Sequence, residues 1–193
     1  MTAANTPIKI CSRASLLIGG DAIQSFEDGS AESSVAAAVY EDMALSTLTN
    51  TRWRFASDQA ILNRLASSPT GRWDSAYQLP SECIMVSAVT INEFPIEYDT
   101  YGRKIFCNAV ETDVVIADYI FRADESTWPP YFTVAMQYVM AGVLATSVAR
   151  DATLAGMMDA KADYYLRLAR SRDSQSQTTR KLNTSRFIAE RRS

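Results

Sequence analysis

The stretch PPYFTVAMQYVMAGVLATSVAR, residues 129–150, decides the fold of this 193-residue chain. It opens with two prolines, which suit the first turn of a helix because that turn needs no N–H partner. Residues 131–149 carry no charge and approach the length of a membrane span. Four of their side chains are nevertheless polar, those of Thr133, Gln137, Thr146 and Ser147. We therefore expect a helix that is buried on all sides of a bundle rather than a membrane span.

A second amphipathic helix is expected from Asp151 to about Ser171, packed on the first. One of its faces carries large apolar side chains, namely Leu154, Met158, Tyr165 and Leu168. Alanines recur beside this face and would permit a close approach of two helices, at positions 155, 162 and 169. Two further helices are expected near the N-terminus. Thr6-Pro7 is a favourable helix start and Gly19-Gly20 a favourable end, and a second helix should begin after Ser30 and stop near Asn50.

The middle of the chain changes to a β pattern after Trp53. Residues 83–91 and Val114–Phe121 form apolar, β-rich runs. Residues 99–103 read as a hairpin turn in which Gly102 supplies the positive φ angle. The expected fold is thus α+β: a helical bundle built from N- and C-terminal helix pairs, with a small antiparallel β lobe inserted between them. The expected parts are residues 1–52, 53–128 and 129–171, followed by an extended basic arm at 172–193.

Charge is distributed unevenly along the chain. Residues 167–193 carry eight Arg or Lys against Asp173 and Glu190, a balance of +6, which leaves −9 on residues 1–166 of the net −3. An acidic body argues against nonspecific duplex binding, which depends on many phosphate contacts. The arm is either a disordered tail or a peptide that orders on a partner. We favour the second, because the arm keeps apolar anchors among basic residues: Arg180, Lys181, Leu182, Arg186, Phe187, Ile188, Arg191 and Arg192.

The sequence offers no catalytic constellation. It contains no histidine, which removes the commonest general base and the commonest metal ligand. Cys11, Cys83 and Cys107 lie far apart among apolar neighbours, so we expect buried thiols rather than a zinc site or a disulfide. Asp159 and Asp163 share a helical face but lack a third ligand. We therefore expect no enzyme activity, no metal and no cofactor.

Four aromatic residues in the middle of the chain allow two interpretations. They could form a platform for stacking nucleic-acid bases. Their apolar, alternating surroundings with few lysines instead favour packing in a core or a subunit interface. These residues are Trp53, Phe55, Trp73 and Tyr77.

Several features in this order resemble the head-to-tail adaptor family of tailed bacteriophages, known in short-tailed phages as tail tubular protein A. Each feature is weak alone, but together they cover most of the chain. They are Leu17-Ile18-Gly19 with Ile23 and Ser25-Phe26; Trp53-Arg54-Phe55-Ala56; Trp73 with Tyr77-Gln78-Leu79-Pro80; the hairpin at Tyr101-Gly102-Arg103; and the closing helix pair with residues 174–181 and 184–188.

The resemblance implies a structural virion protein at the head–tail junction, made in the host cytoplasm. Such proteins form a ring, typically of twelve copies, between the portal and the tail or neck, and extend the DNA channel used for genome packaging, retention and ejection. The implied partners are copies of the chain itself, the portal protein and a downstream tail or neck protein (nozzle or stopper). Double-stranded DNA would pass without specific binding, and no membrane is implied. The arm residues named above would dock on the portal or a neighbouring subunit.

The alternative hypothesis is a small nucleic-acid-binding protein that uses its basic C-terminal tail. A steep salt dependence of DNA affinity that disappears with the tail would favour it.

Overall fold

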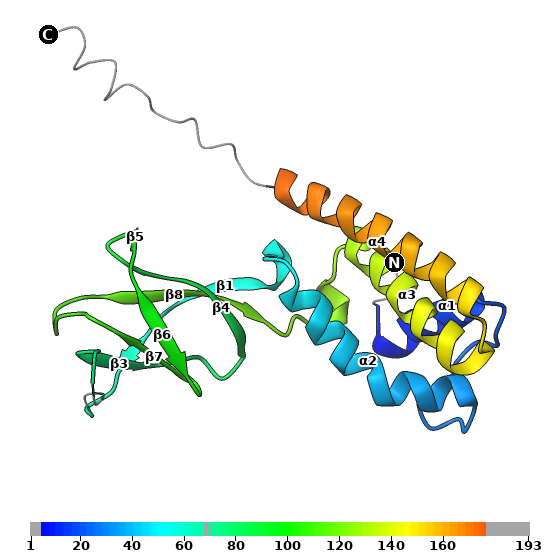
Figure 1. The fold of residues 1–193 in the computed structure, drawn as a ribbon, viewed down its shortest axis with the longest axis horizontal. Coiled ribbons are helices and arrows are strands. Elements are labelled where there is room, and N and C mark those ends of the chain that lie inside the picture. Colours follow the sequence, from blue (N-terminus) through cyan, green and yellow to red (C-terminus); the bar gives the residue numbers. More distant parts are fainter. Residues whose placement is uncertain (1–4, 68, 70, 177–193) are drawn as a thin grey trace, which may run out of the picture.

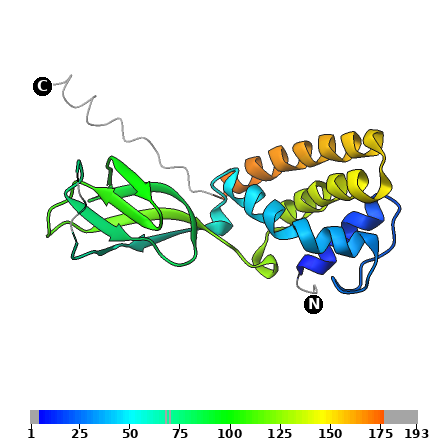
Figure 2. The ribbon, with the colours of Figure 1, turned by 60° about the horizontal axis from the view of Figure 1, so that its bottom comes forward.

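The computed structural model describes residues 5–67, 69 and 71–176, which form a helical bundle and a β lobe (Figure 1). The bundle consists of α1 (Pro7–Leu17), α2 (Ala31–Thr49), α3 (Pro130–Leu144) and α4 (Ala152–Gln175). The two pairs come from opposite ends of the sequence, and α3 packs against α1, α2 and α4. Figure 2 shows the lobe and the bundle as neighbours along the long axis of the molecule. The expected α+β fold, with a β lobe inserted between two helix pairs of one bundle, is confirmed.

The N-terminal helices begin and end where local chemistry dictates. The Thr6 hydroxyl accepts a hydrogen bond from the Lys9 N–H at the start of α1, and Ser30 plays the same part for Ser33 in α2. At the end of α1, the Gly20 N–H donates to the Ser15 carbonyl at 3.0 Å. Gly19 has a φ of +82° there, which glycine adopts without strain, and this closes the helix in a Schellman turn.

The uncharged stretch forms α3, but only one side of it is fully buried. Its buried side chains include Phe132, Met136 and Met140, whereas Tyr131 and Tyr138 remain half-exposed. The expectation of burial on all sides is therefore wrong, because α4 covers α3 and leaves a groove beside it. Pro130–Ala149 is long and apolar enough to cross a membrane by length and composition alone, yet half of it is buried. Core helices meet the same criteria, so this finding assigns no membrane role.

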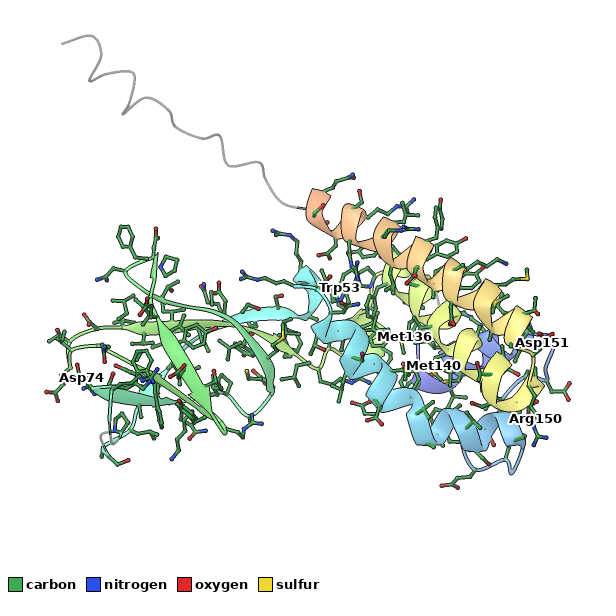
Figure 3. The ribbon with its side chains drawn as sticks, in the orientation of Figure 1. Trp53, Asp74, Met136, Met140, Arg150 and Asp151 are labelled. Carbon is green, nitrogen blue, oxygen red and sulfur yellow. The ribbon has the colours of Figure 1, made fainter. Side chains whose placement is uncertain are left out.

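The C-terminal helix pair is joined by a tight turn. The α-helix gives way to a π-helical turn at Ala145–Ala149, and Arg150 takes a left-handed conformation with φ at 53°. The Asp151 carboxylate then accepts hydrogen bonds from the N–H groups of Thr153 and Leu154, at 2.9 and 3.0 Å. This cap starts α4 and sends it back along α3 (Figure 3).

The face of α4 that packs against α3 combines the expected alanines with part of the expected apolar face. Met158 is buried, Leu154 and Tyr165 pack against the bundle core, and the Tyr165 ring stacks on Tyr138 of α3 with the ring centroids 4.8 Å apart. Leu168 is half-exposed, whereas the three alanines are buried and allow the two backbones to approach closely. The helix also continues to Gln175, beyond the expected end near Ser171. The buried positions are Ala155, Met158, Ala162, Leu166, Ala169 and Asp173.

The β lobe contains two four-stranded antiparallel sheets. The first has the strand order β1-β8-β4-β5 and the second the order β2-β3-β7-β6. Leu62 lies between β1 and β2, so the chain passes from one sheet to the other there. The strands are β1 (Ser57–Ile61), β2 (Asn63–Arg64), β3 (Ser75–Gln78), β4 (Cys83–Ile91), β5 (Phe94–Pro95), β6 (Tyr98–Tyr101), β7 (Lys104–Cys107) and β8 (Val115–Phe121).

Both long β-rich runs of the sequence are strands, and they pair with each other. β4 spans the whole of residues 83–91, and β8 spans all but the first residue of the predicted strand. Tyr101 pairs with Lys104, so Gly102 and Arg103 form the turn between β6 and β7. Gly102 has a φ of +60°, which confirms the predicted turn.

The boundary between the bundle and the lobe lies inside the expected β segment. Trp53 and Trp128 are buried in the bundle core, not in the core of the lobe. Residues Arg54–Ala56 form a 3₁₀ turn instead of continuing the alternating pattern around Trp53. The lobe therefore spans residues 57–121, and a second 3₁₀ turn, Glu125–Thr127, leads back to α3.

Two glycine substitutions separate backbone strain from helix propensity. Gly102→Ala should lower the free energy of unfolding by about 1–2 kcal/mol, because alanine resists the left-handed conformation of this turn. Gly156→Ala should instead raise the free energy of unfolding by about 0.5–1 kcal/mol, because alanine favours the helix more than glycine does. Gly156 lies inside α4 with open space around it, so the added methyl group meets no other atom. Urea unfolding of the two variants checks both signs. A stabilising Gly102→Ala would contradict the turn assignment.

Candidate interaction site

The residues predicted to dock on a partner lie outside the described part of the chain. Arg180, Lys181, Leu182, Arg186, Phe187, Ile188, Arg191 and Arg192 all follow Ser176, the last described residue. Of the predicted arm, residues 172–175 belong to α4. What the structure does define is the point from which residues 177–193 start.

That point is held in place by the carboxylate of Asp173. The residue is only 4% exposed and lies one turn before the end of α4. Its carboxylate accepts hydrogen bonds from the Arg54 N–H at 3.0 Å and from the Tyr131 hydroxyl at 2.8 Å. These bonds connect α4 to the start of α3 and to the turn that precedes β1. Residues 177–193 therefore begin where the bundle meets the lobe.

Asp173 could have been found from the sequence, although the sequence analysis missed it. It follows Leu166 and Ala169 at the spacing of one helix face, and all three are buried. The signal in the sequence is an aspartate at the position where the next buried residue of this helix face falls. The burial of Asp173 within α4 contradicts the expectation that the extended arm begins at residue 172.

A second polar cluster holds the return from the lobe to the bundle. Arg122, just after β8, forms a two-pronged ion pair with Glu41 of α2, with both N–O distances at 2.9 Å. It also donates to Glu125, which accepts a further hydrogen bond from the Tyr40 hydroxyl at 3.0 Å. The guanidinium lies 5.6 Å from the ring of Trp128. Glu41 is exposed and at the same time pairs with Arg122.

The segment that leads from α2 into β1 is stabilised by apolar packing around Trp53 and by one ion pair. Trp53 is fully buried and its indole N–H donates to the Thr47 carbonyl at 2.9 Å. Trp53 belongs to the same buried core as Met136 and Met140 of α3, and Figure 3 shows it at the end of the bundle next to the lobe. The neighbouring Arg52 pairs with Asp118 of β8 at 2.8 Å. Both chain crossings between bundle and lobe are thus fastened by side chains as well as by the backbone.

Burial shifts the titration of several groups at this junction. Burial, reinforced by the charge of Glu125, raises the pKa of the Cys11 thiol to about 12. Burial and the hydrogen bond to Asp173 raise the pKa of Tyr131 to about 12. A hydrogen bond from Arg122 lowers the pKa of Glu41. These shifts accompany structural contacts, and none places a reactive nucleophile in an open cleft.

The cysteines and aromatic residues behave largely as the sequence indicated. Cys11, Cys83 and Cys107 are all buried and free, as expected. Within residues 5–67, 69 and 71–176, no three His, Cys, Asp or Glu side chains are arranged to hold a metal ion. Trp53 and Tyr77 are core residues, whereas Phe55 and Trp73 are half-buried. The Trp73 indole N–H donates to the Asp99 carboxylate at 3.0 Å, so its polar edge is engaged within the lobe.

Large apolar side chains are exposed on both parts of the molecule. On the lobe, Phe94 is 74% exposed and Ile61 is 69% exposed. On the bundle, Leu16, Met157 and Tyr164 are each more than half exposed. Single exposed apolar residues are normal on protein surfaces, so their exposure alone does not identify a contact surface.

Comparison with known proteins does not assign the chain to a family. No family model matches the sequence, and no curated protein matches it significantly.

Replacing Asp173 tests the anchor at the end of α4. Asp173→Ala should lower the free energy of unfolding by about 2–4 kcal/mol, because the Arg54 N–H and the Tyr131 hydroxyl lose their acceptor in a buried place. Asp163→Ala, an exposed position on the same helix, is the matched control and should change it by no more than about 0.5 kcal/mol. Chemical denaturation measures both. Equal effects of the two substitutions would refute the anchoring role.

Alkaline titration tests the environment of Tyr131. Its folded-state pKa of about 12 exceeds the ordinary value of about 10. The unfolded state therefore releases this proton first, so Tyr131 contributes stability below about pH 10 that is lost as the pH rises to about 12. Absorbance of tyrosinate should show a late-titrating group that Tyr131→Phe removes. A normal titration of Tyr131 would contradict its burial against Asp173.

Proposed function

We propose that the chain is a structural virion protein, a head-to-tail adaptor that forms a ring between the portal and the tail or neck. In this role it extends the DNA channel and takes part in genome packaging, retention and ejection. The observation that carries the proposal is the anchored end of α4. Asp173 fixes the origin of the basic segment 177–193 at the junction of bundle and lobe, the middle of an elongated subunit. Residues 177–193 start at this junction and can therefore reach a partner that lies next to the bundle or next to the lobe.

The two-part subunit supports the ring. A closed ring requires two different complementary faces on every copy. The bundle and the lobe differ in secondary structure, and both expose large apolar residues such as Leu16 and Phe94. The side-chain ties at Arg122 and Asp173 keep the two parts in one arrangement, which a repeating contact needs.

The charge of the chain supports DNA passage without specific binding. Residues 1–166 carry a net charge of −9, which repels the phosphate backbone. We propose that acidic side chains of the body face the channel, whereas the basic segment contacts the portal or a neighbouring subunit. An assembled ring with a continuous arginine-lined channel would refute this arrangement.

The test is electron microscopy of the chain mixed with the portal of its virus, using three forms of the protein. These are the full chain, a chain ending at Ser176, and the double variant Phe187→Ala with Ile188→Ala. The truncation starts after Ser176 because removal of Asp173 would itself destabilise the bundle. Portals should gain an added ring with the full chain only, and the double variant should bind weakly while its far-ultraviolet circular dichroism shows that the bundle and the lobe stay folded.

The other outcomes separate the competing functions. A ring gained with all three forms would keep the adaptor role but move docking to the folded body. Binding to the portal by none of them would contradict the adaptor. DNA affinity that falls steeply with salt and vanishes in the chain ending at Ser176 would then support the nucleic-acid-binding alternative.

A further inference from the structure

Among the unpaired edges of the described strands of the β lobe are those of β4 and β6. Over residues 83–88, β4 pairs with β8 on one side only, because β5 reaches it only at Thr90 and Ile91. β6 ends the second sheet and, among the described strands, pairs with β7 alone. Unpaired edges present backbone N–H and C=O groups that can bond to an added strand.

These two edges border the same cleft, which has a volume of about 360 Å³. That is near the small end of the range of ligand clefts, roughly 300–1,000 Å³. Ile84 and Met85 of β4 lie in it and are 37% and 38% exposed. The register of β4 shifts twice here, at residues 83–85 and 86–88, and such bulges often mark where pairing ends. The remaining lining residues are Leu79, Cys83, Val86, Thr100, Gly102 and Arg103.

The charge of the lobe indicates what kind of segment it would attract. Residues 57–121 contain nine Asp or Glu and four Arg or Lys, a net charge of −5. Residues 177–193 contain five Arg or Lys and one Glu, a net charge of +4, and include the apolar pair Phe187-Ile188. The segment thus combines a charge opposite to that of the lobe as a whole with apolar side chains suited to the cleft, whose described lining carries one charged residue, Arg103.

The same segment is long enough to reach the cleft of its own chain. Asp173 contacts Arg54, three residues before β1, and Ser57 of β1 lies across from Ile120, which lies across from Met85. Two strand spacings amount to roughly 10 Å. Eleven residues separate Ser176 from Phe187 and can span up to roughly 36–40 Å when extended. Because the tether is short, the effective concentration of the segment at the cleft is on the order of millimolar. A weak contact is therefore enough to keep the segment bound.

We propose that residues 177–193 bind in cis as an added strand in the cleft between β4 and β6. Phe187 and Ile188 make the apolar contact with the cleft, and the backbone of the segment forms hydrogen bonds with the open edges of β4 and β6. This inference concerns the free chain and does not depend on the head-to-tail role, in which docking on a partner would release the segment from the cleft.

Hydrogen exchange of the full chain tests it, at a concentration at which the chain is monomeric. Amides of residues 83–86 and 98–101 should exchange about tenfold faster in the variant Phe187→Ala with Ile188→Ala than in the unchanged chain. The matched control is Thr184→Ala with Ser185→Ala, which alters the same segment without removing an apolar anchor. Its exchange in these two regions should equal that of the unchanged chain.

Three results would overturn the proposal. Equal exchange in the Phe187 and Ile188 variant and in the unchanged chain would show that the segment does not cover these edges. Protection that grows with protein concentration would assign the cleft to the segment of a second copy. Faster exchange over the whole lobe, β1 included, would show general destabilisation instead of release of one strand.

Discussion

The carboxylate of Asp173 is the constraint on which the arrangement of the chain depends. It is buried where α4 ends, where α3 begins and where the chain enters the lobe. A buried carboxylate is costly unless hydrogen bonds compensate it, and here a backbone N–H and a phenol do so. The three segments must therefore stay together for the buried carboxylate of Asp173 to keep both hydrogen bonds. The end of α4, and with it the start of residues 177–193, is fixed by the same bonds.

The return of the chain from the lobe to the bundle is also held by a charged side chain, in this case Arg122. The lobe connects to the bundle at Ser57 and Phe121, and these two connections are neighbours because Ser57 pairs with Ile120. Arg122 binds Glu41 and Glu125 at one crossing, and Asp173 binds Arg54 at the other. The contact at the first crossing is a hydrogen bond from the Arg54 backbone N–H, whereas the pairs of Arg122 range from the buried Glu125 to the exposed Glu41. The two crossings thus couple the bundle and the lobe, and a proposed ring can use both as one body.

Much of the architecture was accessible from residue patterns. The caps at Thr6 and Ser30, the apolar runs of β4 and β8 and the turn at Gly102 are local signals, and local signals remain valid whatever packs around them. The turn between β4 and β5 was not predicted, because Asn92 and Glu93 take its two positive φ angles and no glycine marks the turn in the sequence. Periodicity identified the packed stripe of α4 in part, because it does not say how deeply alanine, methionine or tyrosine is buried against the next helix.

The sequence by itself determined the α+β class, the two helix pairs around a β lobe, the buried thiols and the uneven charge. These follow from periodicity, turn residues and composition, which each segment carries independently of its neighbours. Only the tertiary structure decided that Asp173 is an anchor, that Arg122 joins Glu41 to Glu125 and that β4 and β6 leave two edges open on one cleft. Such contacts join residues separated by tens of positions, and their partners are chosen by how the helices and sheets pack.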